Sequence, residues 1–144
     1  MRCSVLGVFL LALSASVSAL EYRTVGADAA VLYDAPSAQA KKLFILSPNY
    51  PVEIIVSIDR WMKVRDASGA LAWIETSALS DKRSVLVKVP EAEIRSQPDG
   101  NATLVFKAER DVALELLEIT GAWIKIKHRD GLSGYIAVKD VWGI

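Results

Sequence analysis

The sequence has few side chains that could carry out catalysis. His128 is the only histidine and Cys3 the only cysteine among the 144 residues. A zinc site needs several nitrogen or sulfur ligands, and a cysteine–histidine nucleophile needs both residue types close together. No serine has the glycine-flanked setting of a nucleophile elbow, and the run from His128 to Gly131 is typical of a hairpin turn. The sequence therefore predicts a protein that is not an enzyme and holds neither a metal nor a cofactor.

Two tryptophans, Trp61 and Trp123, are the side chains best suited to hold a ligand. Each follows a short turn and stands out of phase with the aliphatic residues after it, such as Val64 and Ile126. A side chain out of phase with the core set lies on the outer face of a strand. We therefore predict that each indole forms an aromatic platform for a ligand. The alternative is that each indole covers a loop or the other half of the molecule.

These tryptophans belong to two copies of one unit. When the chain is shifted against itself by 62 residues, eight of the 39 positions from 36 to 74 are identical without a gap. The identities include the landmarks of each half: Pro36 and Pro98, Trp61 and Trp123, Gly69 and Gly131, Ile74 and Ile136. Such self-similarity at a fixed offset indicates an internal repeat.

Each copy has the pattern of several short strands separated by turns. In the first copy apolar residues alternate over residues 52–58, 61–65 and 70–74, and the second copy repeats this at 112–119, 122–127 and 132–136. Earlier strands are expected at 30–33 and 92–95, and residues 85–89 are expected to complete the first copy. About five strands in about 60 residues must close on themselves, because an open sheet would leave unpaired edges. The predicted fold is all-β, with two tandem small barrels at residues 20–80 and 83–144.

The first 19 residues have the pattern of a secretory signal peptide. Arg2 is their only charged residue, an apolar run follows, and small residues end the segment at Ala19. The apolar run is shorter than the ~20 residues that span a bilayer. Cleavage after Ala19 would leave a chain without cysteine and without a membrane span. We therefore expect a periplasmic or secreted protein that is not held by disulfides.

The charge balance argues against a nucleic-acid partner. Without Arg2, 16 basic side chains stand against 17 acidic ones, and they are dispersed along the chain. A nearly neutral surface provides no strong field for a polyanion or an anionic membrane. An oligonucleotide-binding barrel would also need a basic groove with interleaved aromatic residues. We expect no nucleic-acid binding.

The motifs of both copies resemble bacterial SH3 domains. The copies read Asp59-Arg60-Trp61-Met62-Lys63-Val64 and Gly121-Ala122-Trp123-Ile124-Lys125-Ile126, each followed by a glycine and then an aromatic–aliphatic pair. The opening motif of that family, an aliphatic residue and an arginine with a proline three residues on, is present at Ile94, Arg95 and Pro98. The first copy has Tyr33 in place of the arginine. The resemblance covers residues 23–142 and implies extracytoplasmic modules that bind cell walls or proteins.

Tyr33 and Arg95 take the same position in the two copies. In animal SH3 domains a similarly placed tryptophan and tyrosines line a peptide groove, so the resemblance implies that Tyr33 and Trp61 could form a proline-sized slot. The second tyrosine of that groove is missing here, which argues against polyproline binding. In the second copy Arg95 and Trp123 could hold a carboxylate. Alternatively, the Arg95 cation rests on the indole face.

Ile55 and Leu117 are aliphatic residues that point away from the alternating core set of both copies. An interface between the barrels would explain them, and so would a partner protein. We predict that one barrel buries Ile55 or Leu117 of the other.

Taken together, these patterns predict an exported, non-catalytic binding or adaptor module. The expected partner is a peptidoglycan peptide or an envelope protein, bound through Tyr33, Trp61, Arg95 and Trp123. The alternative is a structural protein in which one barrel caps the other and neither has a ligand groove. Open aromatic surface at Trp61 or Trp123 would favour binding.

Overall fold

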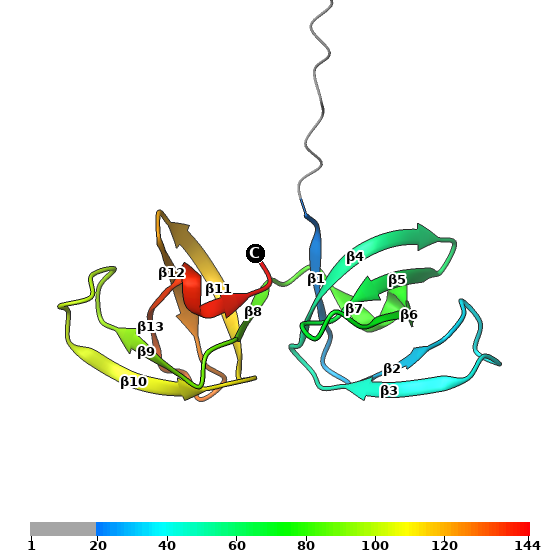
Figure 1. Cartoon of the computed structure of the whole chain (residues 1–144), viewed down its shortest axis with the longest axis horizontal. Coiled ribbons are helices and arrows are strands. Elements are labelled where there is room, and N and C mark those ends of the chain that lie inside the picture. The colour runs from blue at the N-terminus through cyan, green and yellow to red at the C-terminus, as the bar shows by residue number, and fades with distance from the viewer. Residues whose placement is uncertain (1–19) are drawn as a thin grey trace, which may run out of the picture.

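The computed structural model describes residues 20–144, and the predicted signal peptide at residues 1–19 lies outside the described residues. The chain forms two separate sheets of seven strands, and each sheet curls into a small barrel (Figure 1). The predicted all-β fold of two tandem barrels is thereby confirmed. Within residues 20–144, no helix has the length and apolar character needed to cross a bilayer.

The first barrel contains seven strands and one short 3-10 helix. The elements in chain order are β1 (Tyr22–Val25), β2 (Ala30–Tyr33), β3 (Lys42–Leu46), β4 (Pro51–Ile58), β5 (Trp61–Arg65), β6 (Leu71–Glu75), η1 (Thr76–Ala78) and β7 (Leu79–Ser80). The strand order in the sheet is β3-β2-β6-β5-β4-β1-β7. Strands β4, β5 and β6 form the predicted meander.

The second barrel repeats this arrangement element by element. Its elements are β8 (Ser84–Val87), β9 (Glu91–Arg95), β10 (Leu104–Glu109), β11 (Ala113–Thr120), β12 (Trp123–Lys127), β13 (Ser133–Ala137), η2 (Val138–Asp140) and β14 (Val141–Trp142). Its strand order, β10-β9-β13-β12-β11-β8-β14, is the order of the first sheet. The internal repeat read from the sequence is therefore a repeat of the fold.

Each barrel has its own apolar core, built from the inward-facing residues of the alternating strands. The largest fully buried side chains of the first barrel include Leu32 and Ile74, and those of the second include Ile94, Ile124 and Ile136. The side chains of β5 and β12 alternate between buried and half-buried, as the period-two pattern predicts. Trp61 and Trp123 fall on the half-buried, outer face of these strands.

The prediction that residues 85–89 complete the first barrel is wrong. Strand β8 pairs antiparallel with β11 and β14, and so belongs to the second sheet. Its counterpart in the first sheet is β1, which pairs with β4 and β7 in the same way. The 62-residue offset places Val25 on Val87, so extending the repeat toward the N-terminus would have assigned β8 correctly.

The prediction that one barrel buries Ile55 or Leu117 is also wrong. The two side chains are 37% and 44% exposed. Each is the extra residue of a β-bulge, because the β4–β5 register shifts between Ile54 and Val56 and the β11–β12 register shifts between Leu116 and Glu118. A bulge leaves one residue unpaired and changes the phase of the side chains beyond it. The outward aliphatic residues therefore reflect a bulge in each barrel and not a contact between barrels.

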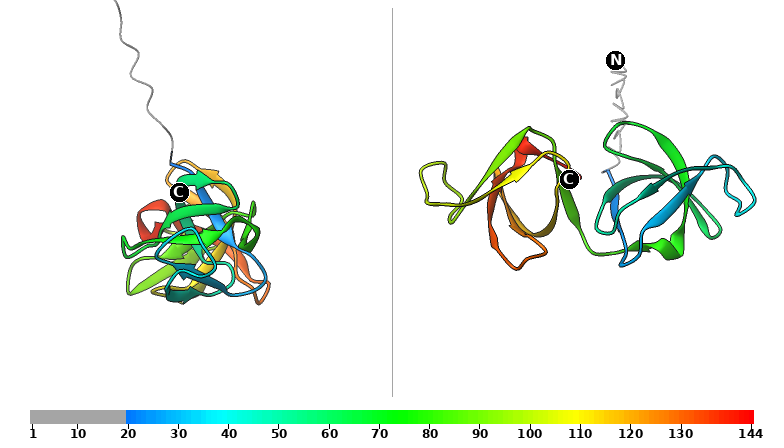
Figure 2. Two further views of the ribbon diagram at one scale, coloured as in Figure 1. Left: turned by 90° about the vertical axis from the view of Figure 1, so that its right-hand side faces the viewer. Right: turned by 90° about the horizontal axis from the view of Figure 1, so that it is seen from below.

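The barrels meet instead through β1, the 47–50 turn, β8 and the C-terminal end (Figure 2). The Ser84 hydroxyl donates to the Asn49 carbonyl oxygen at 2.8 Å, and Thr24 Oγ1 lies 3.0 Å from Ser84 Oγ. Because a serine hydroxyl has one hydrogen, the Thr24 hydroxyl must be the donor to Ser84. Thr24 and Ser84 are each only 2% exposed, so the hydrogen bond between their hydroxyls is shielded from water, whereas Asn49 is exposed.

Aromatic and backbone contacts extend the same junction. The rings of Tyr22 and Trp142 meet edge to face with centroids 5.3 Å apart, and the Arg83 guanidinium lies over the Tyr22 ring, 5.6 Å from its centroid. Gly143 has a φ of +118°, and a Cβ at that position would meet the Ser84 carbonyl oxygen at 3.1 Å and Pro51 at 3.3 Å. These contacts hold the two barrels against each other.

Candidate functional site

The site around Trp61 begins at the turn between β4 and β5. Asp59 has a φ of +54°, a left-handed conformation that aspartate tolerates better than most residues. This turn delivers Trp61 to the first position of β5, opposite Ile58 on one side and Glu75 on the other. Because Met62 and Val64 occupy the core, the indole of Trp61 must lie on the outer face of the sheet.

Tyr33 packs directly on this indole. The two rings meet edge to face, with centroids 5.3 Å apart and planes at 89°. An aromatic pair of this geometry contributes about 0.5–1.5 kcal/mol beyond its buried area. Tyr33 and Trp61 are therefore in contact within the protein, and the proline-sized slot between them stays a prediction. Both side chains remain half-buried, so part of each ring faces solvent.

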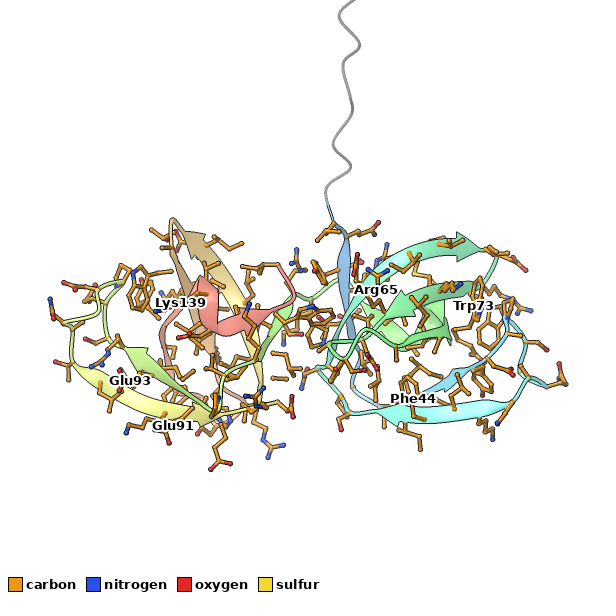
Figure 3. The ribbon with its side chains drawn as sticks, in the orientation of Figure 1. Phe44, Arg65, Trp73, Glu91, Glu93 and Lys139 are labelled. Carbon is orange, nitrogen blue, oxygen red and sulfur yellow. The ribbon has the colours of Figure 1, made fainter. Side chains whose placement is uncertain are left out.

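A third aromatic residue, Trp73, lies beside this pair and was not singled out from the sequence. Trp73, which is labelled in Figure 3, is the register partner of Tyr33 on β2 and of Lys63 on β5. Residues opposite each other in a sheet share one face, so Tyr33, Trp61 and Trp73 form one outer aromatic face. The signal was present in the sequence, because Ala72 and Ile74 point inward and leave Trp73 on the outside.

An open hollow of about 720 Å³ adjoins Trp61. One wall is the 36–39 loop, another is the β4–β5 turn from Ile58 to Arg60, and the third is the end of β6 with the start of η1. Glu75 and Arg60 place opposite charges on its rim. The Thr76 hydroxyl oxygen is buried in this wall and has no hydrogen-bond partner among residues 20–144. We call this hollow and the three aromatic residues beside it the Trp61 groove.

The corresponding face of the second barrel is arranged differently. Trp123 lies at the start of β12, and Tyr135 pairs with Arg95 and Lys125 in the positions that Trp73, Tyr33 and Lys63 occupy in the first barrel. The Arg95 guanidinium donates to the Ala102 carbonyl oxygen at 3.2 Å and forms an ion pair with Glu93. Within residues 20–144 it makes no cation–π contact with Trp123. Arg95 thus binds the chain's own loop and carboxylate.

His128 lies in the turn between β12 and β13, as the sequence predicts. Its Nδ1 is 2.9 Å from Asp130 Oδ1, and the Leu132 backbone N–H donates to the same carboxylate at 2.9 Å. These interactions hold the pKa of Asp130 below its ordinary value, with the Leu132 hydrogen bond contributing most and His128 next. Among residues 20–144 no three histidine, cysteine or acidic side chains gather as metal ligands.

A protein of two small all-β barrels, each carrying a tryptophan at the start of the middle strand of its meander, has the architecture of an SH3-like binding module. A family model described as "Bacterial SH3 domain" matches the chain twice, at residues 26–81 and 88–143. The chain belongs to the bacterial SH3 domain family, whose members are binding modules. The resemblance noted in its motifs is thereby confirmed.

Three of the solved structures that match this chain are of NlpC or NlpC/P60 proteins. NlpC2 and NlpC1 from Trichomonas vaginalis are 17% and 20% identical, with TM-scores of 0.41 and 0.40 over 88% and 94% of this chain. An NlpC/P60 family protein from Bacillus cereus is 14% identical, with a TM-score of 0.40 over 85% of this chain. The chain spans 49%, 50% and 56% of the lengths of these three proteins. No curated protein sequence matches this chain.

Proposed function

We propose that this protein is an exported, non-catalytic binding or adaptor module that recognises a peptidoglycan peptide or an envelope protein through the Trp61 groove. The observation that supports this most is the row of Tyr33, Trp61 and Trp73, three half-buried aromatic side chains on one outer face. Aromatic side chains of this kind dominate the binding energy of interfaces. The adjoining hollow is open to solvent, so a bound peptide could extend through it past the charged groups of Glu75 and Arg60 on its rim.

Two features of the groove suit a peptide. The indole and phenol provide flat apolar surface, and Glu75 and Arg60 can bind an ammonium and a carboxylate. A peptide has the same mixture of apolar, charged and amide groups along one chain. Export and a periplasmic or secreted location rest on the signal-peptide pattern of residues 1–19. After removal of that segment the proposed protein acts without a membrane span.

The test is retention on purified, insoluble peptidoglycan. We expect the wild-type protein to be retained, and Trp61→Ala to lose most of this retention because the platform and its contact with Tyr33 are removed. Ile45→Ala is the matched control, since Ile45 is an aliphatic residue of β3 that is 67% exposed and does not line the groove. Its retention should equal that of the wild type.

Two outcomes contradict parts of the proposal. Equal retention of the wild type and of a Trp61→Ala, Trp123→Ala double variant would show that the tryptophans do not bind the ligand. If the wild type is not retained, peptidoglycan is excluded as the partner and an envelope protein remains. That partner would be sought by cross-linking in intact cells with the same variants.

A structural role is favoured by one observation, the shielded junction between the barrels. In that case one barrel serves to stabilise the other and the Trp61 groove takes no ligand. Trp61→Ala would then lower the free energy of unfolding while leaving every binding measurement unchanged. Thermal unfolding of the variant alongside the retention assay separates the two functions.

A further inference from the structure

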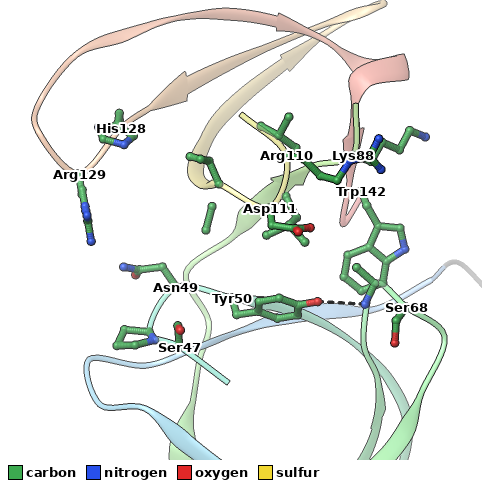
Figure 4. Close-up of a pocket in the computed structure, with 16 residues that line it drawn as sticks. Ser47, Asn49, Tyr50, Ser68, Lys88, Arg110, Asp111, His128, Arg129 and Trp142 are labelled. Atoms are coloured by element: carbon green, nitrogen blue, oxygen red, sulfur yellow. Dashed lines mark hydrogen bonds between the residues drawn. The ribbon is translucent and has the colours of Figure 1, made fainter. Parts of the chain in front are cut away.

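A second cleft lies between the two barrels, apart from the Trp61 groove. It has a volume of about 790 Å³ and is drawn in Figure 4. Its first wall is the 47–50 turn of the first barrel with Ala67 and Ser68. Its second wall comes from β8, the 110–113 segment, the β12–β13 turn and Trp142. No residue of the Trp61 groove contributes to it.

Cations outnumber anions in this cleft. Lys88, Arg110 and Arg129 line it and are exposed, and none of them forms an ion pair with another residue in the 20–144 range. Asp111 is the one carboxylate among the lining residues. By contrast, Arg23, Arg65, Arg95, Lys82 and Lys107 elsewhere in the protein do have carboxylate partners. Three cations without an ion-pair partner therefore lie along one cleft in a chain that is close to neutral, although other such cations, for example Lys42 and Arg60, lie outside it.

Neutral groups in the cleft can also bind a ligand. The Tyr50 hydroxyl accepts a hydrogen bond from the Ala67 backbone N–H at 3.2 Å, which leaves its own hydrogen available to an acceptor in the cleft. Burial is the main cause that raises the pKa of Tyr50, so this hydroxyl stays protonated at neutral pH. Trp142 adds a half-buried indole at the far side (Figure 4).

The walls of the cleft are already in place without a ligand. Asn49 and Asp111 are equivalent in the 62-residue repeat, both have φ near +70°, and their N–H groups donate to Val25 and Val87 carbonyl oxygens at 3.0 and 2.9 Å. The Asn49 turn is further tied to the second barrel by Ser84. A preformed cleft binds with a smaller loss of conformational entropy than a cleft that must close around its ligand.

We propose that this inter-barrel cleft is a second binding site, which takes a peptide segment bearing side-chain or terminal carboxylates. The guanidinium groups of Arg110 and Arg129 bind carboxylates through paired N–H donors, and Lys88 adds a point charge. Asp111 accepts an amide N–H or an ammonium of the same peptide. Asp111 also disfavours polyphosphates and nucleic acids, which offer it no donor and would be repelled by its charge. This proposal does not depend on the Trp61 groove.

The test uses a fluorescein-labelled peptide of alternating alanine and glutamate. The peptide is titrated with the protein comprising residues 20–144, and binding is followed by fluorescence anisotropy. We expect saturable binding that is weakened at least about tenfold by an Arg110→Gln, Arg129→Gln double variant, because hydrogen bonds between charged groups are the strong ones. Lys42→Gln is the control, since it removes an exposed charge from β3 outside the cleft. Its affinity should equal that of the wild type.

Several results would overturn this proposal. A peptide with glutamine in place of glutamate that binds equally well would exclude carboxylate recognition, and unchanged affinity of the double arginine variant would exclude the cleft. Inorganic phosphate and free glutamate are also added as competitors of the labelled peptide. If phosphate displaces the peptide as well as glutamate does at the same concentration, the cleft is a general anion site and does not select carboxylates. Trp61→Ala should bind this peptide like the wild type, so that failure of the Trp61 groove and failure of the cleft are told apart.

Because Arg110 and Arg129 are exposed, the double variant is expected to fold. Amide NMR spectra of the wild type provide an independent readout. Added glutamate peptide should shift the signals of Asn49, Tyr50 and Asp111 while leaving those of Tyr33 and Trp61 in place. Shifts confined to the Trp61 groove would contradict the proposed site.

Discussion

At the scale of single residues, equivalent positions of the two barrels have diverged around a shared tryptophan. Trp61 is flanked by Tyr33 and Trp73, whereas Trp123 is accompanied by Arg95 and Tyr135. In the first barrel the neighbour of the tryptophan is an aromatic ring in contact with it. In the second barrel that neighbour is a cation bound to Glu93 and Ala102. The repeat therefore preserves the scaffold of the site and changes the chemistry of its surface.

This divergence predicts unequal effects of truncating the two tryptophans. We expect Trp61→Ala to weaken binding to an envelope ligand by about 2 kcal/mol or more, as for a central aromatic anchor, and Trp123→Ala by less than about 1 kcal/mol. Retention measured against ligand concentration for both variants provides the comparison. Equal losses would show that the aromatic neighbours of Trp61 contribute nothing to recognition.

At the scale of elements, the curvature and packing of each sheet depend on a few positions where strands approach closely or shift in register. The bulges at Ile55 and Leu117 bend β4 and β11 and so help a short sheet to curl. In the second barrel β13 passes very close to β9 at Gly134, where the first barrel has Ala72. A Cβ on Gly134 would meet Ile94 Cγ2 at 2.5 Å and the Arg95 carbonyl oxygen at 2.7 Å. The two barrels therefore differ in how tightly these strands pack.

We expect Gly134→Ala to destabilise the second barrel by about 1–3 kcal/mol, the usual cost of overpacking a close contact. Urea unfolding followed by tryptophan fluorescence measures the change. Gly100→Ala is the control, because Gly100 lies in an open loop with no atom near the added methyl group. A Gly134→Ala variant as stable as this control would mean that β9 and β13 separate at little cost.

At the scale of the whole molecule, the junction makes two repeats into one body. Thr24, Ser84 and Asn49 are joined by a chain of hydrogen bonds, and Tyr22 packs on Trp142. Two small barrels without a disulfide in the described chain gain buried surface from this contact. The same contact creates the cleft beside it, since the 47–50 turn and β8 are held at its base. Stability of the junction and shape of the cleft therefore depend on the same residues.

The tyrosines at the junction predict a loss of stability at alkaline pH. Burial is the main cause that raises the pKa of both Tyr22 and Tyr50 above the ordinary value. In the unfolded chain these phenols ionise near about pH 10, while the folded protein keeps them protonated to higher pH. The resulting stabilisation is complete below the unfolded pKa and is lost as pH rises through the folded pKa.

Urea unfolding at pH 9 and at pH 11 tests this dependence. We expect the wild type to lose more stability between the two pH values than a Tyr22→Phe, Tyr50→Phe double variant, because phenylalanine cannot ionise. Thermal unfolding at pH 7 serves as the reference for any effect of the missing hydroxyls. An equal pH dependence of the two proteins would exclude the buried phenols as its cause.

The sequence by itself determined the fold class, the repeat, most strands and the outward position of Trp61 and Trp123. These features follow from period-two alternation and turn residues, which act between near neighbours in the chain. A uniform alternation could not reveal the bulges, so Ile55 and Leu117 were misplaced. The assignment of residues 85–89 failed because a strand's partner depends on pairing with residues far along the chain.

Only the tertiary structure decided which distant residues meet. Thr24 with Ser84 and Tyr22 with Trp142 are separated by about 60 residues or more in the chain. Neither of these contacts leaves a local period in the sequence. They arise because two barrels, each folded by its own pattern, pack in one particular orientation, and that orientation places the 47–50 turn opposite the cations of the second barrel.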